Sequence, residues 1–318
     1  MSGPVRAALV GAGAIAPFHV SALRAAGFEI SHLAARPESN RAESFARLHG
    51  IERVWSDPTD LIDSADWDAL VIASATESVP QLLASAKRIG KPCLVEKPVD
   101  FDGATIRELA VNTGHVRVAY NRRFYSTVAA ARDFATTGSC VFRMELPESI
   151  QSADQPMRGL RAVHENSVHG FDLLASIVGR YRIERVDVID EPRSRLAVVS
   201  TPAGHVGTIA LNWNCPANFS LVLDRSPLRF ELKPFELGST YEGMEVIEPS
   251  EDMPVRRYMP RLTQQVNSFP GPDGIKPGFL EQAKSLMSAV QGEGWDSRSA
   301  TIDDAAFVAD IARTLTSD

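Results

Sequence analysis

The chain has 318 residues, of which 44% are hydrophobic and 23% are charged, a balance that is typical of a folded globular protein and excludes a disordered or fibrous one. Its formal net charge of -7 argues against a general nucleic-acid or anionic-membrane binder, because neutralising phosphates requires a surplus of Lys and Arg. The three cysteines are widely spaced, so we expect no metal site. The start lacks a secretory signal, and no stretch approaches the ~20 apolar residues of a membrane-spanning helix, so we expect a cytoplasmic protein.

Short apolar runs alternate with helical patterns over the first 120 residues. The apolar runs predict strands at 5–10, 28–35, 68–73, 93–96 and 116–119. The segments between them predict helices at 14–26, 41–48, 79–89 and 103–112. Strands that alternate with helices at this spacing favour a parallel, doubly wound sheet. We therefore assign residues 1–120 to an α/β domain of the Rossmann type.

The pattern changes after residue 120. Helices are predicted at 126–136, 165–178, 279–290 and 302–315. Strands are predicted at 141–146, 185–189, 196–200, 206–213, 219–223 and 228–232, while 147–161 is expected to be a polar loop and the Pro-rich 248–277 to be irregular. Consecutive strands without intervening helices predict an antiparallel sheet. Residues 121–318 are therefore expected to form a second, α+β domain with a large, mainly antiparallel open sheet.

A glycine-rich turn joins the first predicted strand to the first predicted helix. Gly11, Gly13 and Ala16 form a GxGxxA pattern there. Gly11 allows the tight turn, Gly13 lets a pyrophosphate approach the backbone, and Ala16 permits close packing of the helix on the sheet. The start of the helix, at Ala14 and Ile15, supplies N–H groups and a positive dipole end to the phosphates. The pattern predicts a dinucleotide site, and the alternative is a glycine turn without a ligand.

The end of the second predicted strand favours NADP over NAD. An Asp or Glu there would bind the ribose hydroxyls of NAD, but the chain reads Ala34-Ala35-Arg36. The guanidinium of Arg36 matches phosphate geometry, so we expect it to bind a 2′-phosphate. NAD stays an alternative, with Arg36 stacked on the adenine of either cofactor.

The tripeptide Glu96-Lys97-Pro98 follows the fourth predicted strand, at the edge where open α/β sheets bind ligands. With the glycine turn, it resembles the Gfo/Idh/MocA oxidoreductases, named for glucose-fructose oxidoreductase, inositol dehydrogenase and a rhizopine-catabolism protein, and the resemblance covers essentially the whole chain. It implies that Glu96 lies at the cofactor, that Lys97 contacts the reacting hydroxyl and the nicotinamide ribose, and that Pro98 follows a cis peptide. A lysine ammonium stabilises negative charge that develops on an alcohol oxygen. The alternative for Lys97 is a surface salt bridge with Glu96.

Glu165, His169 and Asp172 lie at i, i+4 and i+7 of a predicted helix and therefore share one face. The family has an Asp-x-Gly-x-His motif, in which the carboxylate orients the substrate and the histidine is a general acid or base. The resemblance implies that His169 is this histidine and that Glu165 replaces the aspartate, with Asp172 structural. A histidine of near-neutral pKa can take the hydroxyl proton as hydride leaves carbon. The alternatives for His169 are a core histidine bonded to Asp172 and an exposed helix face.

Two stretches depart from the family pattern. The family usually has Thr-Pro-Asn-x-x-His after the third strand, where this chain has Ser74-Ala75-Thr76-Glu77-Ser78-Val79. Ser74 is expected to line the cofactor site, in surroundings that differ from those of the family. Glu165 replaces an aspartate and Ser167 a glycine, so the longer carboxylate must sit further back from the substrate.

Four residues are candidate substrate ligands. Asn121 and Arg123 lie in a segment that resembles the asparagine-arginine-phenylalanine stretch at the domain junction of relatives, and the alternative for the arginine is a junction salt bridge. Arg158 and Arg161 lie in the loop before the helix of His169, where a lid would place them on a sugar or its phosphate. Their alternative is a solvated surface charge.

The sequence therefore predicts an NAD(P)-dependent oxidoreductase that transfers hydride between nicotinamide and a hydroxyl-bearing carbon of a sugar, polyol or nucleotide sugar. The sequences of residues 166–172 and 216–220 resemble those of family members that act in sugar metabolism for surface-polysaccharide assembly. The alternative function is a non-catalytic dinucleotide-binding sensor or regulator. Relatives are commonly dimers or tetramers, so we expect a homodimer or homotetramer, with residues 121–318 serving substrate binding and oligomerisation and with no nucleic-acid or membrane partner.

Overall fold

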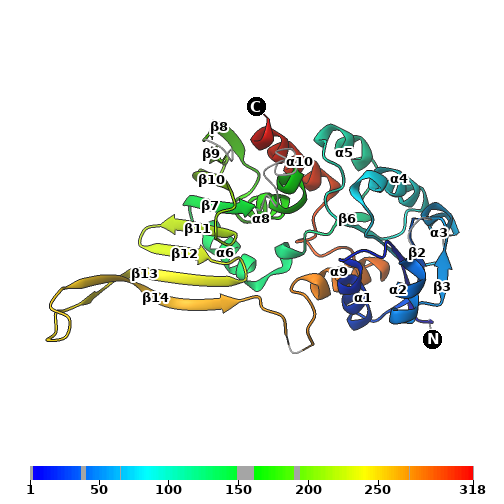
Figure 1. Ribbon diagram of the computed structural model, residues 1–318, viewed down its shortest axis with the longest axis horizontal. Helices are drawn as coiled ribbons and strands as arrows, with labels where there is room; N and C mark the ends of the chain where they lie inside the picture. Colours follow the sequence, from blue (N-terminus) through cyan, green and yellow to red (C-terminus); the bar gives the residue numbers. More distant parts are fainter. Residues whose placement is uncertain are drawn as a thin grey trace. The chain divides into compact units, whose positions relative to one another are not determined.

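The computed structural model of the protein describes residues 3–36, 41–64, 66–148, 161–189, 194–271 and 273–317. The chain forms two compact units, one of residues 1–124 and 270–313 and the other of residues 125–269 and 314–318. Each unit contains its own sheet (Figure 1). The sequence placed everything after residue 120 in the second domain, but α9 (Phe279–Val290) packs against α1 (Ala16–Ala25) and so belongs to the first unit.

The first unit is built on a six-stranded parallel sheet with the strand order β3-β2-β1-β4-β5-β6. Its strands are β1 (Val5–Val10), β2 (Phe28–Ala34), β3 (Arg53–Trp55), β4 (Ala69–Ile72), β5 (Cys93–Val95) and β6 (Val116–Val118). Its other helices are α2 (Ala42–His49), α3 (Pro58–Ser64), α4 (Val79–Ile89), α5 (Gly103–Ala110) and most of α10 (Ile302–Thr316).

This topology confirms the predicted doubly wound fold. The strand order reverses beside β1, between β1 and β4, which is the kind of switch point where open α/β sheets bind ligands. The strand β3 and the helix α3 were not predicted, because three strand residues are too few to show a hydrophobic period. The fourth predicted strand is consequently β5.

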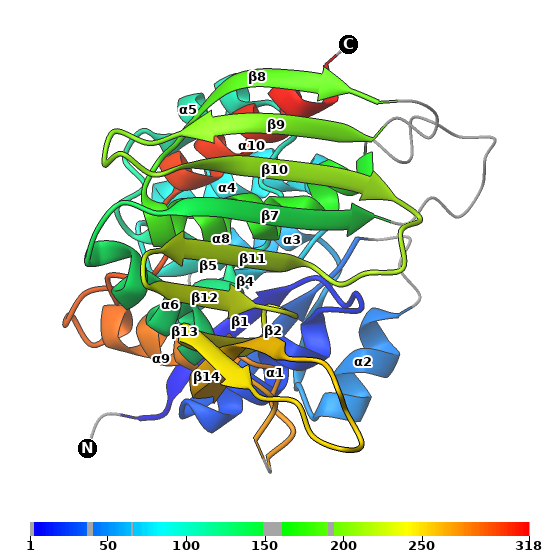
Figure 2. The ribbon, with the colours of Figure 1, turned by 90° about the vertical axis from the view of Figure 1, so that its left-hand side faces the viewer.

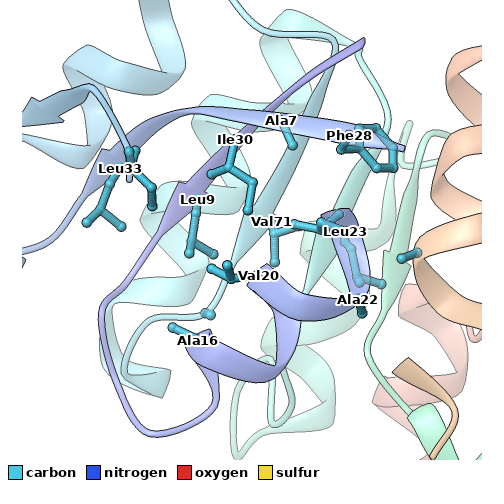
Figure 3. Close-up of a cluster of buried hydrophobic side chains, with 14 of the residues drawn as sticks. Ala7, Leu9, Ala16, Val20, Ala22, Leu23, Phe28, Ile30, Leu33 and Val71 are labelled. Carbon is cyan, nitrogen blue, oxygen red and sulfur yellow. The ribbon is translucent and has the colours of Figure 1, made fainter. Parts of the chain in front are cut away.

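The hydrophobic core of the first unit fixes α1 against the sheet. Leu9, Ile30 and Val71 from three neighbouring strands meet Val20 and Leu23 of α1 in a buried cluster (Figure 3). Full burial of an aliphatic side chain contributes about 1.5–3 kcal/mol to folding. The packing therefore holds the start of α1 close to the carboxyl end of β1.

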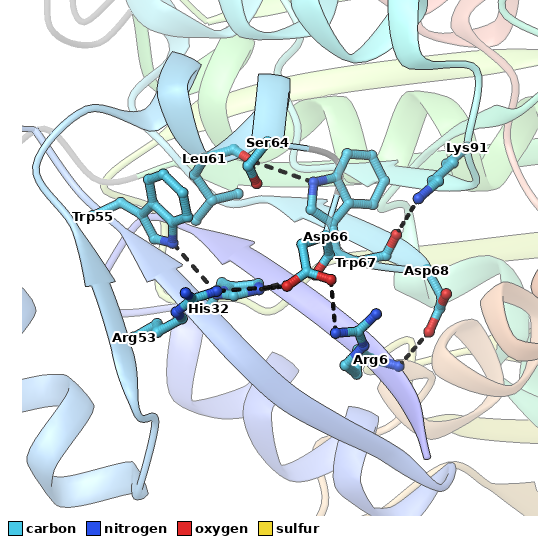
Figure 4. A network of polar contacts seen from close by, with 10 residues as sticks. All are labelled: Arg6, His32, Arg53, Trp55, Leu61, Ser64, Asp66, Trp67, Asp68 and Lys91. Carbon is cyan, nitrogen blue, oxygen red and sulfur yellow. Dashed lines mark hydrogen bonds and ion pairs between the residues drawn. The ribbon is translucent and has the colours of Figure 1, made fainter. Parts of the chain in front are cut away.

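A polar network surrounds Asp66, which precedes β4 in the chain (Figure 4). Arg6 Nη1 donates to Asp66 Oδ1 at 2.7 Å, and His32 Nε2 lies 2.9 Å from the backbone oxygen of Asp66. Trp55 Nε1 donates to His32 Nδ1 at 3.4 Å, so the tautomer that satisfies both contacts carries its proton on Nε2. The network joins β1, β2 and β3 and has a structural role.

The second unit is built on an eight-stranded sheet with the order β14-β13-β12-β11-β7-β10-β9-β8 (Figure 2). Its strands are β7 (Val141–Glu148), β8 (Arg182–Val188), β9 (Arg195–Ser200), β10 (Val206–Trp213), β11 (Ser220–Arg225), β12 (Leu228–Leu232), β13 (Leu237–Ile247) and β14 (Arg257–Asn267). All neighbouring pairs are antiparallel except β7 and β10, as expected for a mainly antiparallel sheet. Helix α6 (Ser126–Thr136) packs against β12, β13 and β14 and against α8 (Val168–Val178).

The prediction that 248–277 is irregular was wrong for its middle part. Residues Arg257–Asn267 form β14, which pairs with β13 and contains Pro260. A proline is tolerated on an edge strand, because its missing N–H need not meet another strand. The prolines of this segment therefore hide the edge strand in the sequence pattern.

We expect the second unit to lose stability as the pH falls below about 6.5, the pKa of histidine in an unfolded chain. His205 is buried, and its Nδ1 accepts the backbone N–H of Cys140 at 3.1 Å, which requires an unprotonated nitrogen. Burial lowers the pKa of His205 and of His164, so the unfolded chain binds more protons than the folded one near pH 6. The stability that these two histidines contribute is therefore fully present above about pH 6.5 and is lost as the pH falls below this value.

Urea midpoints at about pH 7.5 and about pH 5.5 measure this loss. The variant His205→Gln cannot take up the proton and should show a smaller decline between the two conditions. An equal decline in both proteins would assign the acid sensitivity to other groups.

Candidate functional site

The glycine turn follows β1 at the carboxyl edge of the parallel sheet. The Gly11 N–H donates to Ala34 O at 2.7 Å. Gly11 has a φ of +112°, and a Cβ at this position would lie 2.1 Å from the backbone oxygen of Ala73. Only glycine fits between these two strand ends, which is the tight turn that the motif predicted.

The backbone beyond Gly11 has the properties of an anion site. In the described part of the chain, nothing outside the adjacent residues lies within 4 Å of the position that a Gly13 Cβ would take. Ala14 is exposed, and Ile15, the N-cap residue of α1, makes no side-chain cap hydrogen bond. An uncapped helix start beside an open glycine fits a phosphate group, since its N–H groups and dipole favour negative charge. These residues therefore fit the pyrophosphate of a dinucleotide.

Two further predicted cofactor residues follow the strands on either side of β1. Arg36 comes after β2 and is exposed. Ser74 comes after β4 and is half-buried, with its Oγ 3.3 Å from Ser78 Oγ. Because β2, β1 and β4 are neighbours and parallel, Arg36, Gly11 and Ser74 all follow the same edge of the sheet. Residues 37–40, which follow Arg36, lie outside the described part.

The Glu96-Lys97-Pro98 turn follows β5, the neighbour of β4 on this edge. Glu96 is buried, and its Oε1 lies 2.8 Å from Nε2 of His19 on α1. Its Oε2 accepts the backbone N–H of Lys97 at 3.2 Å. Lys97 is half-buried, and the peptide between Lys97 and Pro98 is cis. His19 was not predicted as a site residue, because its only signal in the sequence is its spacing of three residues from Ala16 on the buried face of α1.

In the second unit, a π-helical turn (Val163–Ser167) precedes α8 and contains Glu165. The regular helix that the sequence predicted from Glu165 begins at Val168 instead, and His169 lies half-buried in its first turn. The Oε1 of Glu165 accepts from Arg161 Nε at 2.6 Å, and both side chains are exposed. The predicted catalytic carboxylate and one predicted substrate arginine therefore contact each other. π-helical turns within helices occur frequently at functional sites.

Glu148, at the end of β7, holds this π-helical turn. Its buried carboxylate accepts from Ser167 Oγ and from Asn166 Nδ2, the latter at 3.0 Å. Ser167, where the family pattern has glycine, thus bonds a buried carboxylate. Close by along the chain, a Cβ on Gly170 would lie 2.5 Å from Cδ2 of Leu146, so α8 lies tightly on β7. Glu148 was not predicted as a site residue, because nothing in the neighbouring sequence distinguishes it from the other acids that border a polar loop.

The substrate candidates Asn121 and Arg123 are both buried and bond to residues of the first unit. Asn121 is buried and donates from Nδ2 to Pro277 O at 2.9 Å. Arg123 is also buried, with its Nη1 3.2 Å from Asp304 Oδ2 on α10. These contacts favour the alternative reading of Arg123 as a salt bridge, here within the first unit. Arg158 lies outside the described residues.

The described part of the chain has three free cysteines, of which Cys215 is exposed. It contains no group of three or more His, Cys, Asp or Glu side chains placed to hold a metal ion. Cys93 and Cys140 are buried, and burial raises the pKa of both thiols, which keeps them protonated. Asp172, expected to be structural, is buried as well.

None of the described helices is both long and apolar enough to cross a membrane.

Known proteins resemble the chain in sequence and in fold. A family model described as an oxidoreductase family with an NAD-binding Rossmann fold matches residues 5–119. Inositol 2-dehydrogenase 1 of Saccharopolyspora erythraea is 30% identical over 221 residues, which cover 63% of this chain and 65% of the relative. The chain thus spans slightly less than two thirds of that relative.

Solved structures match over nearly the whole chain. A levoglucosan dehydrogenase in complex with NADH and levoglucosan has a TM-score of 0.77 at 17% identity, covering 98% of this chain and 95% of the other. The scyllo-inositol dehydrogenase of Lactobacillus casei, with NAD(H) and scyllo-inositol, has a TM-score of 0.71 at 15% identity, covering 98% and 96%. Residues 5–119 therefore match the Gfo/Idh/MocA oxidoreductase family, and the chain as a whole shares its fold with these two dehydrogenase structures.

Proposed function

We propose that the protein is an NAD(P)-dependent dehydrogenase or reductase that acts on a hydroxyl-bearing carbon of a sugar or polyol. The observation that carries the proposal is the edge of the parallel sheet, where the uncapped start of α1 and the turn that bears Lys97 follow nearby strands. The relatives named above, which are inositol and levoglucosan dehydrogenases, support the substrate class. A nucleotide sugar is a narrower version of the same proposal.

A nicotinamide dinucleotide held at this edge would supply the hydride acceptor of the proposed reaction, or the hydride donor in the reverse direction. Gly13 and the start of α1 hold the pyrophosphate. The Lys97 ammonium stabilises the charge that develops on the alcohol oxygen, and the His169 imidazole takes the hydroxyl proton. The alcohol thus loses a hydride and a proton and becomes a carbonyl. Glu165, paired with Arg161, orients the substrate hydroxyls.

Dinucleotide binding and turnover test this function separately. Protein fluorescence measures the affinities for NADH and NADPH, and nicotinamide absorbance follows turnover with a panel of inositols, aldoses, levoglucosan and nucleotide sugars. Turnover that depends on one of these compounds is the expected result. Dinucleotide binding without turnover across the whole panel would favour the sensor or regulator instead.

We further propose that Arg36 selects NADP by binding its 2′-phosphate. The guanidinium is exposed after β2, and the two residues before it, Ala34 and Ala35, carry no carboxylate for ribose hydroxyls. Arg36→Ala should weaken the binding of NADPH by about 1.5–3 kcal/mol, which is roughly 10- to 150-fold in affinity. The affinity for NADH should change little. The exposed Arg47 on α2 offers the matched control, Arg47→Ala. Equal losses of affinity for the two dinucleotides would refute the selection of NADP and would favour NAD as the cofactor.

We also propose that the protein is a homodimer or homotetramer. The strands β13 and β14 expose Met244, Val246, Tyr258 and Leu262, and apolar side chains grouped in this way are typical of interfaces. Light scattering coupled to gel filtration measures the mass. A monomer at micromolar concentration would contradict the proposal.

A further inference from the structure

A buried hydrogen-bonded pair, His19 and Glu96, joins α1 to the turn that contains Lys97. The two residues are 2% and 8% exposed, and they are 77 positions apart in the sequence. His19 Nε2 lies 2.8 Å from Glu96 Oε1. An ionised carboxylate has no proton to donate, so the histidine is the donor from Nε2. The pair links the helix that follows the glycine turn directly to the residue before Lys97.

The second carboxylate oxygen of Glu96 fixes the backbone of Lys97. Glu96 Oε2 accepts the Lys97 N–H at 3.2 Å, while the Glu96 N–H donates to Ile72 O of β4 at 2.8 Å. Each carboxylate oxygen therefore has one donor, from α1 on one side and from the following residue on the other. Removing the His19 donor would leave a buried carboxylate oxygen unsatisfied, which is costly and is relieved by rotation of the side chain. Such a rotation would break the bond to the Lys97 backbone.

The imidazole of His19 is held in place by α9. Its ring centroid lies 5.0 Å from that of Phe279, at an interplanar angle of 57°. Phe279 is buried and also contacts the ring of Phe18 at 6.0 Å. A side chain locked by packing presents its donor at one position, which is the requirement for orienting a second residue.

We propose that His19 is a positioning residue, which acts through Glu96 to fix the backbone of Lys97 relative to the start of α1. Its effect on turnover rests on the proposed function, whereas its effect on the Lys97 backbone does not. The arrangement also explains why an acid is buried immediately before Lys97, since its carboxylate serves two protein donors.

Two substitutions separate the donor from the bulk of the ring. His19→Phe keeps an aromatic ring against Phe279 and removes the donor, while His19→Gln keeps a donor near the position of Nε2. We expect His19→Phe to lower kcat by about tenfold or more and to leave the KM for the sugar or polyol within about threefold, because a reacting group displaced by ~1 Å loses rate rather than binding. His19→Gln should recover most of kcat.

Hydrogen exchange at the Lys97 amide provides a readout without substrate. It should become faster in His19→Phe and stay near the wild-type rate in His19→Gln and in Ser21→Ala, a matched control at an exposed position of the same helix. In a Lys97→Ala background, His19→Phe should lower turnover no further, because the lysine that it positions is absent. A purely structural role would lower the melting temperature and leave kcat unchanged.

Wild-type kcat together with wild-type exchange at Lys97 in His19→Phe would overturn the proposal. If His19→Phe does not fold, His19→Met decides, because it fills a similar space without a donor and should also speed exchange at Lys97; unchanged exchange there overturns the proposal as well. A wild-type protein inactive on the whole panel would refute the proposed function, while the exchange measurement would still decide the role of His19.

Discussion

Replacing Lys97 by alanine is expected to lower kcat by about 10²- to 10⁴-fold. In the proposed reaction its ammonium meets charge that exists only as the carbon–hydrogen bond breaks, and an interaction made in the transition state alone appears in kcat. The lysine lies one residue after the buried Glu96, whose carboxylate bonds its backbone. Loss of the side chain therefore leaves the turn in place.

Affinity for the dinucleotide is the internal control for Lys97→Ala. It should change by no more than about twofold, since the pyrophosphate is assigned to Gly13 and the start of α1. Lys284→Ala, at an exposed lysine on α9, is the matched substitution that should leave both kcat and affinity unchanged. Wild-type turnover in Lys97→Ala would remove this residue from the mechanism, and a parallel loss of affinity would make it a cofactor ligand instead.

Replacing Gly11 by alanine is expected to destabilise the first unit by about 2–5 kcal/mol or to prevent its folding. The new Cβ would lie 2.1 Å from the backbone oxygen of Ala73, and the φ of +112° is one that side-chain-bearing residues rarely adopt. Neither problem can be relieved by rotating a side chain, because the obstacle is the backbone of the segment that follows β4. Urea unfolding followed by circular dichroism measures the loss.

Gly13→Ala is the matched variant, two residues further along. Its Cβ would enter open space, so the free energy of unfolding should change by less than about 1 kcal/mol. Dinucleotide affinity should fall, however, because the added methyl group occupies the space through which a pyrophosphate approaches the backbone. Wild-type stability in Gly11→Ala would contradict the geometry described here, and unchanged affinity in Gly13→Ala would contradict the assignment of the pyrophosphate site.

Much of the fold follows from short stretches of sequence. The run from Val5 to Ala25 predicts strand, turn and helix by itself, because the hydrophobic period changes from that of a strand to that of a helix across two glycines. The helices at 79–89, 126–136 and 279–290 were predicted with the bounds that the structure shows. The strand β14 was missed, since a proline breaks a strand in the middle of a sheet but not at its edge, and position within a sheet is not a local property.

By itself, the sequence determined the order of most elements, the glycine turn and the residues that follow most of the parallel strands, because these depend on neighbours within a few positions. Only the tertiary structure decided that α9 returns to the first unit, that Glu148 holds Ser167, and that the carboxylate of Glu96 is bound by His19. These contacts join residues far apart in the chain, and a buried polar group takes whichever partner the packing brings to it. No local pattern in the sequence records that choice of partner.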